Sequence, residues 1–305
     1  MMFRVAFQVA LALSALSGSL GAASPRKSAT VCNGRAELCS RPYGNTTFLG
    51  SHYSWFVSND PFAVERSQEV DIPSQLNLGL LTRTTLVPGR TASYISVIVL
   101  LFDGGLVGTD YLSQVKTFLD ANPNEVLTLL FINRVEGLSI TDLWKPAFDN
   151  SGLTPFIYVP PHQPMKRSEW PTLGELIDSG KRVIVFMDTG ADGSVDFILP
   201  ELPMLWEPPT DPTDPSFPCS VNRIEGPLST EDHLSMLNHN LDINLFNAIL
   251  IGDRGNASTT NCITSILANA NGCAPLAGGV APNFVMLDWV NVGQGKAAVD
   301  RLNGY

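Results

Sequence analysis

Basic residues are scarce in this sequence, and so are long apolar runs. The chain has 19 Lys and Arg against 29 Asp and Glu, which gives a formal net charge of −10 at pH 7. This balance argues against a nucleic-acid partner, because a phosphate backbone is bound by clustered Lys and Arg. It also disfavours adhesion to anionic membranes. Beyond the N-terminus no apolar stretch reaches the ~20 residues that span a bilayer, so we expect a soluble chain without a transmembrane segment.

Several motifs that would mark a catalytic or cofactor site are missing. The sequence has no Gly-x-Ser-x-Gly nucleophile elbow, no phosphate-binding loop and no dinucleotide fingerprint. A zinc site is weakly supported, because the four histidines are scattered and no two cysteines have two-residue spacing. Asp188, Asn238 and Asp288 offer oxygen ligands for calcium, but no calcium-loop spacing supports such a site. We therefore expect no required cofactor.

The N-terminus reads as a secretory signal peptide. Arg4 precedes an apolar run from Val5 to Leu13, and small residues follow from Ser14 to Ala23. The run is too short for a transmembrane helix, so the alternative to a signal peptide is a buried N-terminal helix. We predict removal of residues 1–23 and a single secreted domain over 24–305, expected to be a monomer.

The cysteine count is odd, at five. In an exported chain cysteines usually pair, so one is left over or pairs between chains. Cys32 and Cys39 enclose a short loop and are natural partners. Asn45 and Asn256 each open an Asn-x-Ser/Thr triplet, and export makes their glycosylation plausible.

Strand-like and helix-like segments alternate along the chain. Expected strands cover 48–52, 96–102, 125–132, 156–159, 182–187, 234–246 and 284–290, and expected helices cover 109–122, 140–150 and 173–179. Runs such as 125–132 lack polar alternation, which is typical of a parallel strand buried on both faces. Together with the length, this alternation predicts a single TIM-type (β/α)8 barrel. Residues 208–218, rich in Pro, Asp and Thr, read as a surface loop near the site mouth; residues 71–81 stay unassigned.

In such barrels the working residues stand where strands end. Polar side chains that follow the expected strands are His52, Asn133, Asp188, Asn238, His239 and Asp288. His and Asp at these positions could serve as base, orienting carboxylate or metal ligand. Asp188 could instead cap a turn, and His239 could be a hydrogen-bonded core histidine. We interpret His162 and His233 as ordinary surface residues.

Several sequence blocks occur in an order that is similar to one family. They are 32–39, 45–52, 117–126, 170–177, 180–188, 190–192, 214–218, 238–239 and 283–290. One reads Asn-Thr-Thr-Phe-Leu-Gly-Ser-His and ends at His52. Together they span most of the chain after residue 23. In this order they resemble the fungal secreted phosphatidylinositol-phospholipase-C-like phosphodiesterases.

The resemblance implies a barrel that cleaves a phosphodiester by general acid–base chemistry. It implies His52 as the base and Asp288 as the carboxylate that orients it. A second histidine would protonate the leaving diacylglycerol oxygen, and an arginine would steady the phosphate. It also implies a Cys219–Cys273 disulfide, which leaves Cys262 unpaired. The implied substrate is a small-molecule or lipid phosphodiester, which would place the protein in lipid metabolism.

The chain departs from the family around the expected second and third strands. The family usually has Gly-x-Arg and then His-x-Cys-His there, but this chain has Gly79-Leu80-Leu81 and, at 94–99, Tyr-Ile-Ser-Val-Ile-Val. No histidine lies between His52 and His162, and Arg83 has the parity of the opposite strand face. We therefore expect an irregular barrel in this region and no identifiable acid or phosphate arginine.

Two explanations of this departure are open. Residues 81–99 could arise from a frame slip or a mis-read splice junction, or they could have drifted in an inactive paralogue. Tyr53 is a further departure, because the family usually has Asp or Asn after the first histidine.

The leading functional prediction is a phosphoric diester hydrolase of the phospholipase C type, with activity impaired by the missing groups. The alternative is an inactive secreted barrel that binds a ligand. A glycoside hydrolase is less well supported, because it needs two facing carboxylates and the expected strand 125–132 is followed by Asn133.

Overall fold

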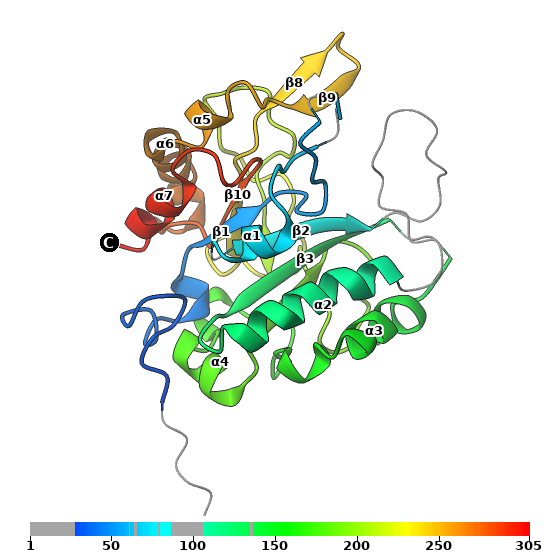
Figure 1. Ribbon diagram of the computed structural model, residues 1–305. Coiled ribbons are helices and arrows are strands. Elements are labelled where there is room, and N and C mark those ends of the chain that lie inside the picture. The colour runs from blue at the N-terminus through cyan, green and yellow to red at the C-terminus, as the bar shows by residue number, and fades with distance from the viewer. Residues whose placement is uncertain (1–27, 61, 64–65, 79, 87–105, 135–136) are drawn as a thin grey trace, which may run out of the picture.

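The computed structural model describes residues 28–60, 62–63, 66–78, 80–86, 106–134 and 137–305 (Figure 1). Within these ranges no helix is both long and apolar enough to cross a membrane. The predicted signal peptide and the expected strand 96–102 lie outside the described residues, as does most of the segment 81–99.

Eight parallel strands form the centre of the molecule. They are β1 (Phe48–Ser51), β2 (Leu80–Leu86), β3 (Leu127–Asn133), β4 (Val183–Met187), β5 (Leu199–Pro200), β6 (Leu205–Trp206), β7 (Leu234–Asn238) and β10 (Phe284–Leu287). Their order in space is β5-β4-β3-β2-β1-β10-β7-β6, so the first strand pairs with the last. The described ladder is interrupted only between β5 and β6, which residues 201–204 connect. This is the predicted α/β barrel, with its seam between β5 and β6.

Where the structure describes their side chains, the strands of the barrel are buried on both faces, and successive residues of a strand pack into different cores. One cluster collects alternate residues of five strands: Phe48, Leu130, Ile184, Phe186, Leu234, Met236, Phe284 and Met286. The residues between them, such as Leu129 and Val185, pack outward against helical residues. This period of two is what a pleated strand imposes, so the first cluster fills the barrel interior.

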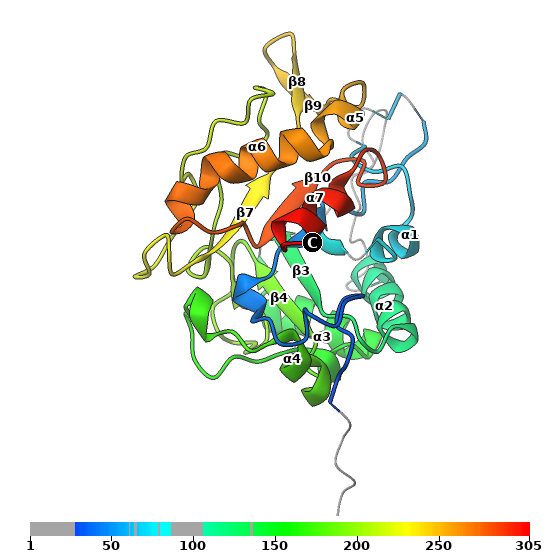
Figure 2. The ribbon, with the colours of Figure 1, turned by 90° about the vertical axis from the view of Figure 1, so that its left-hand side faces the viewer.

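Helices cover the outside of the barrel. They are α1 (Ile72–Leu76), α2 (Leu106–Ala121), α3 (Ile140–Ser151), α4 (Leu173–Ser179), α5 (Ala257–Thr260), α6 (Ile263–Cys273) and α7 (Gly295–Leu302). Short 3-10 turns are η1 (Tyr43–Asn45), η2 (Thr154–Phe156), η3 (Arg167–Glu169) and η4 (Ala274–Ala277). In Figure 1, α2 and α3 lie outside β3, and Figure 2 shows α6 and α7 outside β7 and β10.

The helix α4 shows how the sequence sets these boundaries. The Thr172 hydroxyl accepts from the Glu175 amide while the Glu175 carboxylate accepts from the Thr172 amide, which satisfies two otherwise unpaired donors. Gly180 ends the helix at φ 74°, a left-handed conformation that glycine adopts at little cost. The predicted helix 173–179 is therefore confirmed.

Two expected strands need correction. Residues 156–159 form no strand: η2 is followed by a single bridge between Ile157 and Val183. Pro155 lies within this turn, and Pro160 and Pro161 follow the bridge. These prolines have no amide hydrogen, so the bridge is not extended into a ladder on either side. The run 234–246 is also not one strand, because it divides into β7 and β8 (Asp242–Leu245).

β8 pairs antiparallel with β9 (Ile249–Gly252), and this hairpin projects beyond the barrel (Figure 1). Three residues, 246–248, connect the two strands. Phe246 and Asn247 both have φ 55°, and the Ala248 amide donates to the Leu245 carbonyl at 3.0 Å, which closes a β-turn with left-handed central residues. Its side chains are largely in solvent, and Phe246 is 93% exposed.

Two disulfides are present, Cys32–Cys39 and Cys219–Cys273, and Cys262 is free. These are the two pairs expected from the short loop and from the family resemblance. Asn45 and Asn256, the glycan acceptors expected from their triplets, are both exposed.

Candidate active site

His52 and Asp288 meet at the carboxyl ends of two neighbouring strands. Ser51 of β1 stands opposite Leu287 of β10 in the parallel register, so the next residue of each strand falls at the same edge. The His52 amide donates to the Leu287 carbonyl at 2.9 Å. His52 Nδ1 then lies 2.8 Å from Asp288 Oδ1, although the two residues are 236 positions apart in sequence.

A buried glutamine holds this junction together. The Gln68 side-chain amide donates to the carbonyl oxygens of His52 and Leu287, at 2.7 and 3.0 Å. Its oxygen accepts from the Val290 amide at 3.1 Å. Gln68 thereby fixes the backbone on both sides of the pair, and with it the distance between His52 and Asp288.

The pair is almost completely buried, with side-chain exposures of 6% for His52 and 4% for Asp288. Burial raises the pKa of the Asp288 carboxyl, and the nearby His52 and a hydrogen bond from Ser67 act against that rise. When Asp288 is ionised, its carboxylate can only accept, and the hydrogen between the two groups then resides on Nδ1. The arrangement leaves Nε2 as the basic nitrogen.

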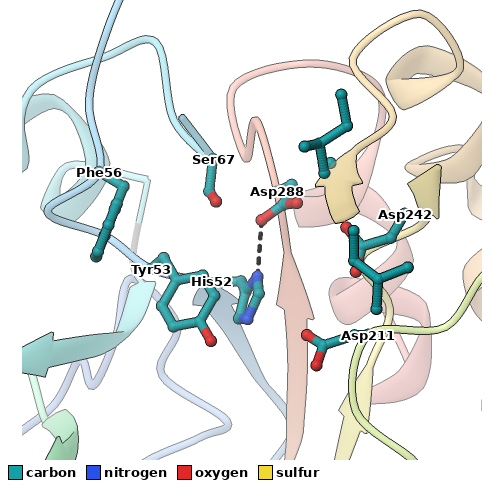
Figure 3. Close-up of a pocket in the computed structure, with 10 residues that line it drawn as sticks. His52, Tyr53, Phe56, Ser67, Asp211, Asp242 and Asp288 are labelled. Atoms are coloured by element: carbon teal, nitrogen blue, oxygen red, sulfur yellow. Dashed lines mark hydrogen bonds and ion pairs between the residues drawn. The ribbon is translucent and has the colours of Figure 1, made fainter. Parts of the chain in front are cut away.

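The pair opens into a cavity of about 300 Å³ (Figure 3). Its described lining is His52, Tyr53, Phe56, Ser67, Asp211, Asp242, Leu250, Ile251, Gly252 and Asp288. Tyr53 and Phe56 lie on one side of His52, and Asp211 and Asp242 lie on the other (Figure 3). The ring nitrogen that does not face Asp288 points away from it. No hydrogen-bond partner contacts that Nε2 within the part of the chain that the structure describes.

Two carboxylates of this cavity were not among the residues predicted from the sequence. Asp211 belongs to the loop 208–218, which was expected near the site mouth, and Asp242 opens β8. The Asp242 amide donates to the Pro212 carbonyl at 2.8 Å, which ties the loop to the hairpin. Burial, and then the neighbouring Asp288 and Asp211 carboxylates, raise the pKa of Asp242 to about 8.

Asn133 and Asp188 come together, but they do not line this cavity. Asp188 Oδ1 accepts from the Asn133 amide at 2.7 Å, and its Oδ2 pairs with Arg134 at 2.9 Å. Asn133 and Arg134 line a separate hollow beside Thr189. The Asp188 side chain thus links the ends of β3 and β4.

Asn238 and His239 are buried outside the cavity as well. Asn238 donates to Glu207 and to the Pro208 carbonyl. His239 hydrogen-bonds the Thr260 carbonyl at 2.8 Å, and its ring stacks on Phe217 with centroids 4.1 Å apart. Burial lowers the pKa of His239 to about 4, so this histidine is neutral near pH 7 and has the contacts of a core residue.

The remaining histidines differ from each other. His162 is exposed, as predicted. His233 was predicted at the surface, and this is wrong: it is 1% exposed, and its ring nitrogens lie within hydrogen-bond distance of the Ser229 and Glu225 carbonyls. Its loop folds back on its own backbone, which composition alone did not indicate. Among the described residues no cluster of three His, Cys, Asp or Glu side chains could hold a metal ion.

The sequence pattern of the family described as PI-PLC X 1 matches residues 38–303. An uncharacterized secreted protein of the fungus Arthroderma benhamiae is 37% identical over 281 residues, covering 88% of this chain. The chain spans 62% of the length of that relative. A second protein of the same fungus, PI-PLC X domain-containing protein 1, is 34% identical over 291 residues, which are 92% of each chain.

Solved structures agree at the level of the fold. The phosphatidylinositol-specific phospholipase C of Staphylococcus aureus superposes with a TM-score of 0.55 at 13% identity, covering 86% of this chain and 94% of that one. The enzyme of Listeria monocytogenes gives 0.53 at 12% identity, with coverages of 88% and 96%. Because the family pattern covers most of the chain, we conclude that this protein belongs to the PI-PLC X domain family.

Proposed function

We propose that the protein is a phosphoric diester hydrolase of the phospholipase C type, with His52 as its general base. The observation that carries this proposal is the buried His52–Asp288 pair at the mouth of the barrel. Asp288 fixes the imidazole with Nδ1 protonated, so Nε2 is free to take a proton from a nucleophilic hydroxyl in the cavity. Asp288 also stabilises the imidazolium that forms.

The reaction would begin with a hydroxyl next to the phosphate. As Nε2 removes its proton, the oxygen attacks phosphorus, and the bond to the leaving alcohol breaks. With a hydroxyl of the substrate itself as nucleophile, the first product is a cyclic phosphate. The names of the relatives and of the structural neighbours support phosphatidylinositol-like diesters as the first substrates to test.

We further propose that the protein acts outside the cell. Two disulfides support this, because such bonds persist mainly in oxidising compartments. A relative that is 37% identical is named a secreted protein.

A second candidate function is ligand binding without turnover. Its support is the composition of the cavity, whose described wall contains three carboxylates and no Arg or Lys to neutralise a phosphate. No histidine lies between His52 and His162 in the sequence either. Both candidates use the same cavity, so only an activity measurement separates them.

The test is cleavage of phosphatidylinositol and of soluble glycerophosphoinositol, with the cyclic phosphate followed by ³¹P NMR. We expect His52→Ala to lower kcat by a factor of ~10²–10⁴, the usual contribution of one positioned proton-transfer group. Because the variant also leaves the buried Asp288 carboxyl without its partner, the rates are compared below the Tm of both proteins. His162→Ala, at an exposed histidine, is the matched control and should keep full activity. A chelator should leave the rate unchanged. Equal turnover by His52→Ala and the native protein would refute the assignment, and binding without any product would establish the second candidate.

A further inference from the structure

The proposed base has no histidine partner to act as acid. When the bond between phosphorus and an alkyl oxygen breaks, the leaving group needs a proton, because an alkoxide is a poor leaving group near neutral pH. The described lining of the cavity holds one histidine, and Asp288 already engages it. The proton donor must then be sought among the other groups of the cavity.

Asp242 occupies the wall of the cavity opposite Tyr53 and Phe56, beyond His52 (Figure 3). Its backbone is fixed on two sides: its amide donates to the Pro212 carbonyl, and it stands opposite Gly252 in the β8–β9 register. No hydrogen bond from a described residue engages its carboxyl group. A substrate oxygen in the cavity could therefore be its partner.

Burial and the neighbouring carboxylates favour the protonated form of Asp242. The titratable groups on the elements around it are His52 and Tyr53 after β1, Asp211 in the loop 208–218, Asp253 after β9 and Asp288 after β10. Burial together with the carboxylates of Asp288 and Asp211 raises the pKa of Asp242 to about 8, so near pH 7 this side chain is an acid that can donate. A carboxyl group with an ordinary pKa would already be ionised there.

We propose that Asp242 is the general acid of this site. It protonates the leaving oxygen, a role for which the described cavity holds no second histidine. This role rests on the proposed diesterase function. In the step, His52 Nε2 accepts the proton of the nucleophile, a new O–P bond forms and the old P–O bond breaks. The leaving oxygen then receives the proton of Asp242. Afterwards imidazolium returns its proton to water and Asp242 regains one, so charge and protons balance.

The proposal is tested with two diesters that share a head group but differ in leaving group. One releases an alkyl alcohol, which needs protonation, and the other releases p-nitrophenolate, which does not. Asp242→Asn should lower kcat for the alkyl diester by a factor of ~10²–10⁴ and leave the nitrophenyl diester nearly unchanged. The alkyl rate of the native protein should fall above about pH 8 as Asp242 ionises, and the nitrophenyl rate should not fall there.

Two control variants separate a role of Asp242 as general acid from other causes of lost activity. Asp211→Asn removes a carboxylate that helps to raise the pKa of Asp242, so the fall of the alkyl rate should move to lower pH, while the nitrophenyl rate should still show no such fall. His52→Ala should slow both reactions by similar factors of ~10²–10⁴, so its result tests the base independently of the acid. Equal losses for both diesters in Asp242→Asn would indicate a binding or structural role and would overturn the proposal, as would no loss for either. If the native protein cleaves neither diester, the proposed function fails and this role fails with it.

Discussion

Tyr53 and Trp289 follow His52 and Asp288, and both have left-handed backbones, with φ 43° and 44°. This conformation costs a non-glycine residue ~1–3 kcal/mol, but it turns the chain sharply where the strand ends. The His52 and Asp288 side chains therefore stay at the barrel mouth. Asn and Asp tolerate this region best, so Tyr53 is an unusual residue at this position. Gln68 supplies compensating hydrogen bonds to the same backbone.

His239 makes a prediction about acid stability. Burial lowers its pKa from 6.5 to about 4, so between these values the unfolded chain binds a proton that the folded chain does not. The contribution of neutral His239 to the free energy of unfolding is therefore fully present above pH 6.5. It is lost as the pH falls toward 4, by up to about 3 kcal/mol. We expect His239→Gln to flatten this part of the curve of unfolding free energy against pH, measured with urea. His162→Gln, at an exposed position, should keep the native slope; an unchanged slope in His239→Gln would contradict the argument.

The β8–β9 hairpin supplies much of one cavity wall. It also packs closely against Asp288, the partner of the proposed base. A Cβ atom at Gly252 would lie 2.6 Å from Trp289 Cη2 and 2.9 Å from Asp288 Oδ2. Such contacts force the hairpin or the Asp288 carboxylate to move. The hairpin therefore sets the position of Asp288 as well as that of Asp242, which pairs with Gly252.

We expect Gly252→Ala to lower the stability by ~1–3 kcal/mol, as overpacking does, and to lower the diesterase rate by displacing Asp288. Gly255→Ala, three residues further on, is the control, because its Cβ would meet no atom closer than 3.4 Å. Thermal unfolding and turnover of both variants make the comparison. Native activity in Gly252→Ala would show that the wall gives way without moving Asp288.

The same hairpin shows where prediction from the sequence ended. His52 and Asp288 could be found because the apolar strands before them are unmistakable, and parallel strands bring their carboxyl ends to one edge. Asp242 could not, because it lies in the run 234–246, whose apolar residues read as one strand. Phe246 and Asn247 form the turn that divides the run, but Phe is an unusual residue at φ 55°. The burial of His239 and His233 depends on distant segments that fold over them, and no local pattern records this.

The Cys219–Cys273 disulfide joins the loop after β6 to the end of α6 across 54 residues of sequence. A crosslink of that length removes conformational entropy from the unfolded chain, worth about 4 kcal/mol in the loop-closure model. We expect the double variant Cys219→Ala with Cys273→Ala to lose stability of this order in urea unfolding. Cys262→Ser, which alters the free cysteine, should change it little. Peptide mapping without reductant checks the pairing, and a Cys262–Cys273 bridge would contradict it.

The pairing of the first strand with the last has a consequence for how the protein is made. During translation β1 emerges early, but its neighbour β10 begins only at Phe284. Until then one edge of β1 lacks its partner, and such an edge can recruit other chains. His52 likewise lacks its partner until Asp288 has been synthesised, 236 residues later. A product that terminates before Phe284 would keep His52 but would have neither the closed barrel nor the Asp288 carboxylate. Such a truncated product would therefore lose its fold and its catalytic pair together.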